Sequence, residues 1–198
     1  MSNLNALYND ITLEEACDLI IALGDSLTFL MQGHTGIGKS SMINTIGDRL
    51  NIPYNRRYYF DCTTKQSGDV SVPKFTTLDG RETLSFIPNS ELGFGHSEPV
   101  LVMVDEFGKS DKGVMKSMLR FLHEGKIGEY SLPSGSIKFA TTNLGTEGLG
   151  DLLPAHARNR LGVIKIKKPS NTAWIENFAI HANIHPIICL LYTSDAAD

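Results

Sequence analysis

The sequence predicts an α/β fold with a mostly parallel central sheet. Short β-rich runs alternate with amphipathic helical stretches along the chain, which is typical of parallel strands connected by helices. With 198 residues, the chain is long enough for one full domain with a sizeable buried core. Hydrophobic residues make up 41% and charged residues 20% of it, so the composition is that of an ordinary globular protein.

The first part of the chain contains the signals for two helices and two strands. Thr12 and Glu15 form a capping box that predicts the start of a helix, and Gly24 predicts its end. Apolar periodicity predicts the elements that follow. These are a strand at 26–32, a helix at 39–50 and a second strand at 57–62.

The second part begins with a predicted hairpin at 74–86. Asp79-Gly80 lies between two β-rich arms, which is the strongest short-range signal for a hairpin. We expect this hairpin to be a working surface, with a mere extension of the sheet as the alternative. The elements predicted after it are strands at 99–104, 137–142 and 162–166, a helix at 110–124, and the first helix of a new segment at 172–182.

The segment GHTGIGKS is a complete phosphate-binding loop, or P-loop, motif. Its glycines let successive backbone N–H groups surround a phosphate, and the following helix directs its positive end at the anion. We expect Lys39 to reach the β- and γ-phosphates and Ser40 to ligate Mg²⁺. A chance glycine-rich turn is disfavoured, because a strand precedes the loop and a helix follows it. The predicted nucleotide-binding residues are Gly33, His34, Thr35, Gly36, Ile37, Gly38, Lys39, Ser40 and Ser41.

Two acidic residues follow the predicted strand at 99–104. We expect Asp105 to hold Mg²⁺ and Glu106 to polarise an attacking water. Many P-loop kinases have no need of the second carboxylate, because their acceptor is not water. The alternative is an ordinary acidic strand exit, which the P-loop upstream makes less attractive.

Asn143 closes the segment IKFATTN. The carboxyl ends of parallel strands meet at one edge of a sheet, so Ser40, Asp105 and Asn143 are expected to gather there. An amide in that place can orient the hydrolytic water, whereas the alternative is a turn-forming asparagine. Farther along, Arg158 or Arg160 is a candidate to stabilise transition-state charge in a neighbouring subunit. A solvated surface arginine is the alternative for each.

The order of these motifs resembles that of the AAA+ ATPases. The P-loop, the Asp-Glu strand, the Asn-ended strand and an L-P-x(5)-R segment before a further strand occur in sequence, and the resemblance covers about residues 12–188. The segment MLRFLHEGKIGEYSLPSGSIKFATTN resembles the MoxR-like and dynein-related branch, in which phage and bacterial members are common. The implied roles are Walker A for Lys39 and Ser40, Walker B for Asp105 and Glu106, sensor 1 for Asn143 and arginine finger for Arg160.

The resemblance also implies an architecture and a function. It implies a three-layer α/β/α P-loop domain over residues 1–168 and the start of a truncated helical lid over 169–188, too short to assign a second sensor arginine. ATP and Mg²⁺ are the implied cofactors, and hydrolysis is expected to drive remodelling of a protein or nucleoprotein partner by a homo-oligomeric ring, expected to be a hexamer. Two alternatives stay open: a nucleotide-gated binding or scaffold protein with little turnover, and a P-loop kinase.

Composition limits the remaining possibilities. The formal charge of −4 argues against a broadly basic nucleic-acid-binding surface and leaves a local basic patch open. No apolar run reaches the length of a membrane span, and the N-terminus lacks a signal core. Three cysteines without paired spacing fit a reducing compartment, so we expect a cytoplasmic protein. We interpret residues 189–198 as a translated sequencing adapter, with a genuine short tail as the alternative.

Overall fold

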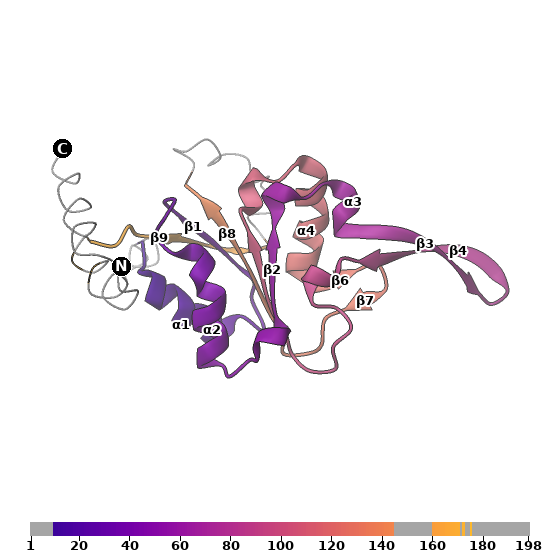
Figure 1. Cartoon of the computed structure of the whole chain (residues 1–198), viewed down its shortest axis with the longest axis horizontal. Coiled ribbons are helices and arrows are strands. Elements are labelled where there is room, and N and C mark those ends of the chain that lie inside the picture. The colour runs from indigo at the N-terminus through magenta and orange to yellow at the C-terminus, as the bar shows by residue number, and fades with distance from the viewer. Residues whose placement is uncertain (1–9, 145–159, 171, 173–174, 176–198) are drawn as a thin grey trace, which may run out of the picture.

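The computed structural model describes residues 10–144 and 160–170, together with residues 172 and 175. Its centre is a five-stranded sheet with the order β2-β5-β8-β1-β9, and every neighbouring pair in it is parallel (Figure 1). The strands are Phe29–Gly33 (β1), Arg57–Asp61 (β2), Leu101–Asp105 (β5), Ile137–Asn143 (β8) and Gly162–Ile166 (β9). The predicted parallel sheet is therefore confirmed.

Helices cover both faces of this sheet. Helices α1 (Leu13–Leu23) and α2 (Met42–Arg49) lie on one face, and α4 (Lys112–Glu124) lies on the other with the short α3 (Ser67–Val70) (Figure 1). Alternate residues of each strand point to opposite faces, which divides the buried side chains into two clusters. Met103 belongs to the α1–α2 side, whereas its neighbour Val104 packs on the α4 side. These two clusters make the fold a three-layer α/β/α structure, as predicted.

The helix ends follow from local capping. Thr12 caps α1 and exchanges hydrogen bonds with Glu15, so the predicted capping box is confirmed. Helix α2 begins at Met42, later than predicted, because residues 39–41 form a tight 3-10 turn at the P-loop exit. Helix α4 likewise begins at Lys112, because the Asp111 side chain accepts a hydrogen bond from the Val114 N–H and acts as the N-cap.

The predicted hairpin is confirmed and is longer than the sequence indicated. Its arms are Ser71–Leu78 (β3) and Arg81–Pro88 (β4), and they form a two-stranded sheet of their own that projects from the body (Figure 1). Asp79 and Gly80 have φ angles of 50° and 76°, the two positive values that a type I′ turn requires. The hairpin therefore does not extend the central sheet.

A second, smaller hairpin was not predicted. Strands Lys126–Ile127 (β6) and Tyr130–Ser131 (β7) follow α4 and pair antiparallel. Strands this short carry too few residues for an alternating pattern to be recognised. Gly128, in the connecting turn, lies against Phe86 of β4, so the small hairpin supports the base of the long one.

Several expectations fall on residues outside the described ranges. They are Arg158, the tail at 189–198, and most of the lid at 169–188 with the helix expected at 172–182. Within the described part of the chain, no helix combines the length and the apolar character that crossing a membrane requires.

Candidate nucleotide-binding site

The strand order brings the predicted site residues to one edge of the sheet. Strand β8 lies between β1 and β5, so Gly33 at the end of β1 is paired with Asn143 at the end of β8. On the other side of β8, Val104 is paired with Ala140, which sets Asp105 beside Thr141. Successive side chains of a strand point to opposite faces, so those of Asp105, Thr141 and Asn143 all point to one face, the face that α1 and α2 cover.

The loop after β1 has the backbone conformation of an anion-binding nest. Gly36 and Gly38 have φ angles of 80° and 92°, which favour glycine, and the chain then enters the turn at Lys39 and α2. A Cβ atom at Gly36 would meet nothing within 4 Å, so the space beside this glycine is open. A Cβ atom at Gly33 would lie 2.5 Å from Ile37 Cδ1, so a side chain at this position would require the Ile37 side chain to move.

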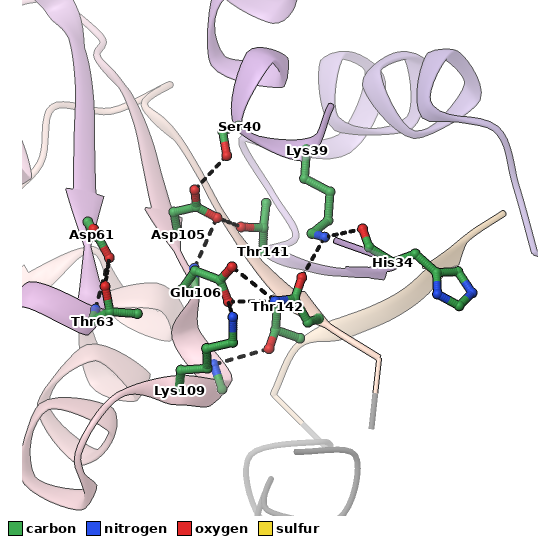
Figure 2. A network of polar contacts seen from close by, with 12 residues as sticks. His34, Lys39, Ser40, Asp61, Thr63, Asp105, Glu106, Lys109, Thr141 and Thr142 are labelled. Atoms are coloured by element: carbon green, nitrogen blue, oxygen red, sulfur yellow. Dashed lines mark hydrogen bonds and ion pairs between the residues drawn. The ribbon is translucent and has the colours of Figure 1, made fainter. Parts of the chain in front are cut away.

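The other predicted loop residues surround this nest. The His34 carbonyl oxygen faces Lys39, whereas its imidazole ring points away (Figure 2). Ile37 packs into the core cluster on the α1–α2 side. The Ser41 hydroxyl donates to the Gly38 carbonyl oxygen at 2.7 Å, and Thr35 is exposed at the tip of the loop. Ser41 therefore fixes the loop from within.

Lys39 is buried, with 6% of its surface exposed. Its Nζ atom donates to the carbonyl oxygens of Gly33 at 2.9 Å and His34 at 2.7 Å, and to Asn143 Oδ1 at 2.8 Å. Figure 2 shows the contact with His34. These acceptors compensate the loss of water around the ammonium. The positive charge is thereby held at the carboxyl ends of β1 and β8.

Asp105 is buried and accepts four hydrogen bonds. Its Oδ2 atom accepts from Ser40 Oγ at 2.8 Å and Tyr59 Oη at 2.6 Å, and its Oδ1 atom accepts from Thr141 Oγ1 and, at 3.0 Å, from the Glu106 N–H. Burial raises the pKa of Asp105, but these hydrogen bonds outweigh burial and hold the pKa below its usual value. The carboxylate is therefore ionised at neutral pH.

Glu106 has a left-handed backbone conformation, with φ 52° and ψ 35°, which is rare for a residue with a side chain. The next turn is held because Gly108 N–H donates to Thr142 Oγ1 at 3.2 Å. The Glu106 carboxylate accepts from Asn143 Nδ2 at 3.0 and 3.1 Å and pairs with Lys109 Nζ at 3.1 Å (Figure 2). Its orientation is thus set from two sides.

The donor atoms fit magnesium. Ser40 Oγ and the Asp105 carboxylate are hard oxygen donors 2.8 Å apart beside the open nest. Mg²⁺ prefers oxygen ligands and is usually held by one or two protein groups together with water and phosphate oxygens. Among the described residues no group of three or more His, Cys, Asp or Glu side chains could hold a metal ion, so a dedicated protein cage is not formed there.

Arg160 is the one predicted site residue in the described ranges that the structure does not bring to this edge. It is exposed and precedes β9, whose first residue Gly162 is paired with Phe29, the first residue of β1. Arg160 therefore lies at the amino end of the sheet. The strands rise about 3.3 Å per residue, so the length of β1 separates Arg160 from the P-loop by roughly 13 Å.

Several residues of the hydrogen-bond network were not predicted from the sequence, and three of them contact the acidic pair. Thr141 contacts Asp105, Lys109 contacts Glu106, and Tyr59 contacts Asp105. Thr141 stands two residues before Asn143 in a buried strand, and that spacing was a signal that could have been used. Tyr59 carries no such signal, because its contact depends on β2 being the neighbour of β5.

Comparisons with known proteins address the fold. A scan against protein-family models found no match, and a search of curated proteins found no relative. Among solved structures, one of a protein from Cytophaga hutchinsonii, described as a "putative ATPase", matches with a TM-score of 0.57 and 13% sequence identity. The match covers 92% of this chain and 55% of that one, so the chain spans about half the length of this structural relative. At this identity the similarity establishes a shared fold, the three-layer α/β/α P-loop architecture.

Proposed function

We propose that the chain binds ATP together with Mg²⁺ at the P-loop and hydrolyses it. The observation that carries the proposal is the continuous hydrogen-bonded set formed by Lys39, Asn143 and Glu106, next to the pair formed by Ser40 and Asp105. A phosphate cradle, a magnesium-compatible oxygen pair and a carboxylate within reach of water are the three parts that nucleotide hydrolysis needs. The P-loop fold shared with the bacterial protein supports the nucleotide-binding part.

The residues have distinct roles in this proposal. The Lys39 ammonium has three donors, and it exchanges the Asn143 oxygen and one of its two backbone acceptors for a β- and a γ-phosphate oxygen. Ser40 and Asp105 hold the cation, which supplies charge neutralisation for the phosphate oxygens when it is bound. Glu106 accepts the proton of the attacking water, and Asn143 orients that water beside the γ-phosphate.

We further propose that the active form is a ring of identical chains. Arg160 lies at the amino ends of the strands, whereas the P-loop lies at their carboxyl ends. Its guanidinium is therefore better placed to serve a neighbouring chain than its own. An arginine supplied in this way stabilises transition-state charge. A hexameric ring that remodels a protein or nucleoprotein partner, as in the MoxR-like branch of the AAA+ ATPases, is the finer form of this proposal. We assign it to the cytoplasm, because Cys17 and Cys62 are free buried thiols.

Nucleotide binding and phosphate release test this function together. Glu106→Gln should keep ATP affinity and reduce hydrolysis by about 10²- to 10⁴-fold, since only the proton acceptor is removed. Glu124→Gln is the matched control, because this glutamate is paired with Arg120 on the exposed side of α4. Lys39→Ala should instead weaken ATP binding by about 10- to 100-fold, because it removes a charged donor.

The same measurements separate the proposal from its alternatives. A single slow turnover that Glu106→Gln leaves unchanged would indicate a nucleotide-gated scaffold. Transfer of labelled γ-phosphate to an acceptor other than water would indicate a P-loop kinase. Wild-type ATP affinity in Lys39→Ala would contradict the assignment of the loop.

A further inference from the structure

We propose that Tyr59 is a positioning residue that holds Asp105 in the orientation needed to bind magnesium beside Ser40. This inference rests on the proposed function and adds to it a residue that belongs to neither the P-loop nor the acidic strand end. The direct observation is the hydrogen bond of 2.6 Å from the Tyr59 hydroxyl to Asp105 Oδ2.

The contact acts on the oxygen that faces the P-loop. Asp105 Oδ2 accepts from Tyr59 and also from Ser40 Oγ, at 2.8 Å. The other oxygen, Oδ1, is held by Thr141 and by the Glu106 N–H. Two donors on each oxygen fix the rotation of the carboxylate, and Tyr59 is the donor that keeps Oδ2 turned toward Ser40. When Ser40 ligates a cation, its hydroxyl hydrogen can still donate to this oxygen, so the arrangement is compatible with a bound metal.

The sheet explains how Tyr59 reaches this atom. Tyr59 is paired with Met103, two residues before Asp105, and residues 103 and 105 point to the same face. The tyrosine side chain therefore runs along that face toward the carboxyl end of β5. It is 43% exposed, so its hydroxyl can be removed without opening a cavity in the core. Groups in contact with a metal ligand commonly change metal affinity by about 10- to 100-fold when they are lost.

The neighbouring Tyr58 offers a matched control. Its side chain points to the opposite face of the sheet, where the hydroxyl donates to the Asn55 carbonyl oxygen at 3.2 Å and contacts His96. Tyr58→Phe and Tyr59→Phe thus remove the same atom from adjacent positions of β2. Only Tyr59→Phe removes a donor to Asp105.

The test is a binding titration with a fluorescent ATP analogue, carried out on the 198-residue chain at increasing Mg²⁺ concentration and in EDTA. For Tyr59→Phe we expect the half-saturating Mg²⁺ concentration to rise about 10-fold, since three donors to Asp105 remain. Its affinity for the analogue in EDTA should equal that of the wild type. Tyr58→Phe should match the wild type in both measurements.

The outcomes separate this inference from the proposed function. A Tyr59→Phe chain with wild-type Mg²⁺ dependence would overturn the inference and leave the proposed function standing. An equal loss of affinity with and without Mg²⁺ would also overturn it, because the residue would then act on the nucleotide or on the fold. A wild-type chain that binds no ATP analogue under any condition would overturn the proposed function, and the inference with it.

Discussion

The amide nitrogen of Asn143 donates to both carboxylate oxygens of Glu106, at 3.0 and 3.1 Å. The amide oxygen of the same side chain accepts from Lys39 at 2.8 Å. Asn143 therefore links the residue proposed to meet the γ-phosphate with the residue proposed to activate water. A ligand that draws the Lys39 ammonium away would remove one of the contacts that fix this amide, and the change would reach Glu106 directly.

Replacement of Asn143 by alanine should separate binding from hydrolysis. Lys39 keeps two carbonyl acceptors and Glu106 keeps its ion pair with Lys109, so ATP affinity should change by only a few-fold. Hydrolysis should fall by about 100-fold, because the group proposed to orient the water is lost. ATP binding and phosphate release measure the two effects. Asn55→Ala is the control, because Asn55 is exposed and lies in the turn just before β2. Unchanged hydrolysis in Asn143→Ala would remove Asn143 from the mechanism.

Asp105 should make the metal-free chain sensitive to acid. Burial raises the pKa of Asp105, but its four hydrogen bonds hold the folded-state pKa below the ordinary value of about 3.9. Such a group stabilises the fold at pH values above its unfolded pKa, and this contribution is lost as the pH falls through the folded pKa. The free energy of unfolding, measured by urea denaturation, should therefore decline below about pH 4.

Asp105→Asn tests the origin of that decline. The variant has no carboxyl group to protonate, so the slope of unfolding free energy against pH should become shallower on the acid side. Asp79→Asn serves as the control, since Asp79 is exposed in the turn of the long hairpin. Equal slopes in Asp105→Asn and the wild type would show that other carboxyl groups cause the acid sensitivity.

The sequence was sufficient to predict the elements of the site but not every contact in it. The P-loop, Asp105 and Asn143 could be predicted to lie together, because the motif is local and parallel strands end at one edge of the sheet. Tyr59 and Lys109 could not. Tyr59 meets Asp105 only because β2 is the neighbour of β5, and Lys109 reaches Glu106 through a turn whose left-handed start at Glu106 has no signature in the sequence.

Fold prediction was limited in a similar way. The long hairpin was recognised from Asp79-Gly80, but the ends of its arms were not, because Val72 and Ile87 pair beyond the predicted range. The strand order was also not predictable, since it depends on which crossover connections pack best on the two faces of the sheet. That order is what sets Asn143 between Gly33 and Asp105.

The outer part of the long hairpin should be dispensable for folding and for nucleotide binding. Phe75 and Leu84 in its arms are exposed, at 76% and 50%, so the outer part of the hairpin contributes little to the core. Deletion of residues 77–78 and 81–82 keeps the Asp79-Gly80 turn and sets the paired residues Thr76 and Thr83 beside it. We expect Tm to stay within about 2 °C of the wild type and ATP affinity to be unchanged. A large loss of Tm would show that the hairpin is structural.

Arg160 gives the sharpest test of assembly. If it serves the site of a neighbouring chain, each active site combines the Lys39 of one chain with the Arg160 of the next. Specific activity should then rise with protein concentration as rings form, and monomers separated by dilution should be nearly inactive. Lys39→Ala and Arg160→Ala should each be inactive alone, because every interface in either assembly lacks one of the two groups.

Mixing the two inactive variants should restore activity. In a random mixture of equal amounts, about a quarter of the interfaces join an intact Lys39 to an intact Arg160, so the mixture should recover up to about that fraction of wild-type hydrolysis. Because Gly162 is paired with Phe29, Arg160 lies at the amino end of its own sheet, away from its own P-loop. Recovery through the chain's own arginine is therefore not expected. Chromatography under the assay conditions must show that both variants assemble. A mixture that assembles and yet stays inactive would exclude Arg160 as the shared residue, and the same experiment with Arg158→Ala would then test the second arginine.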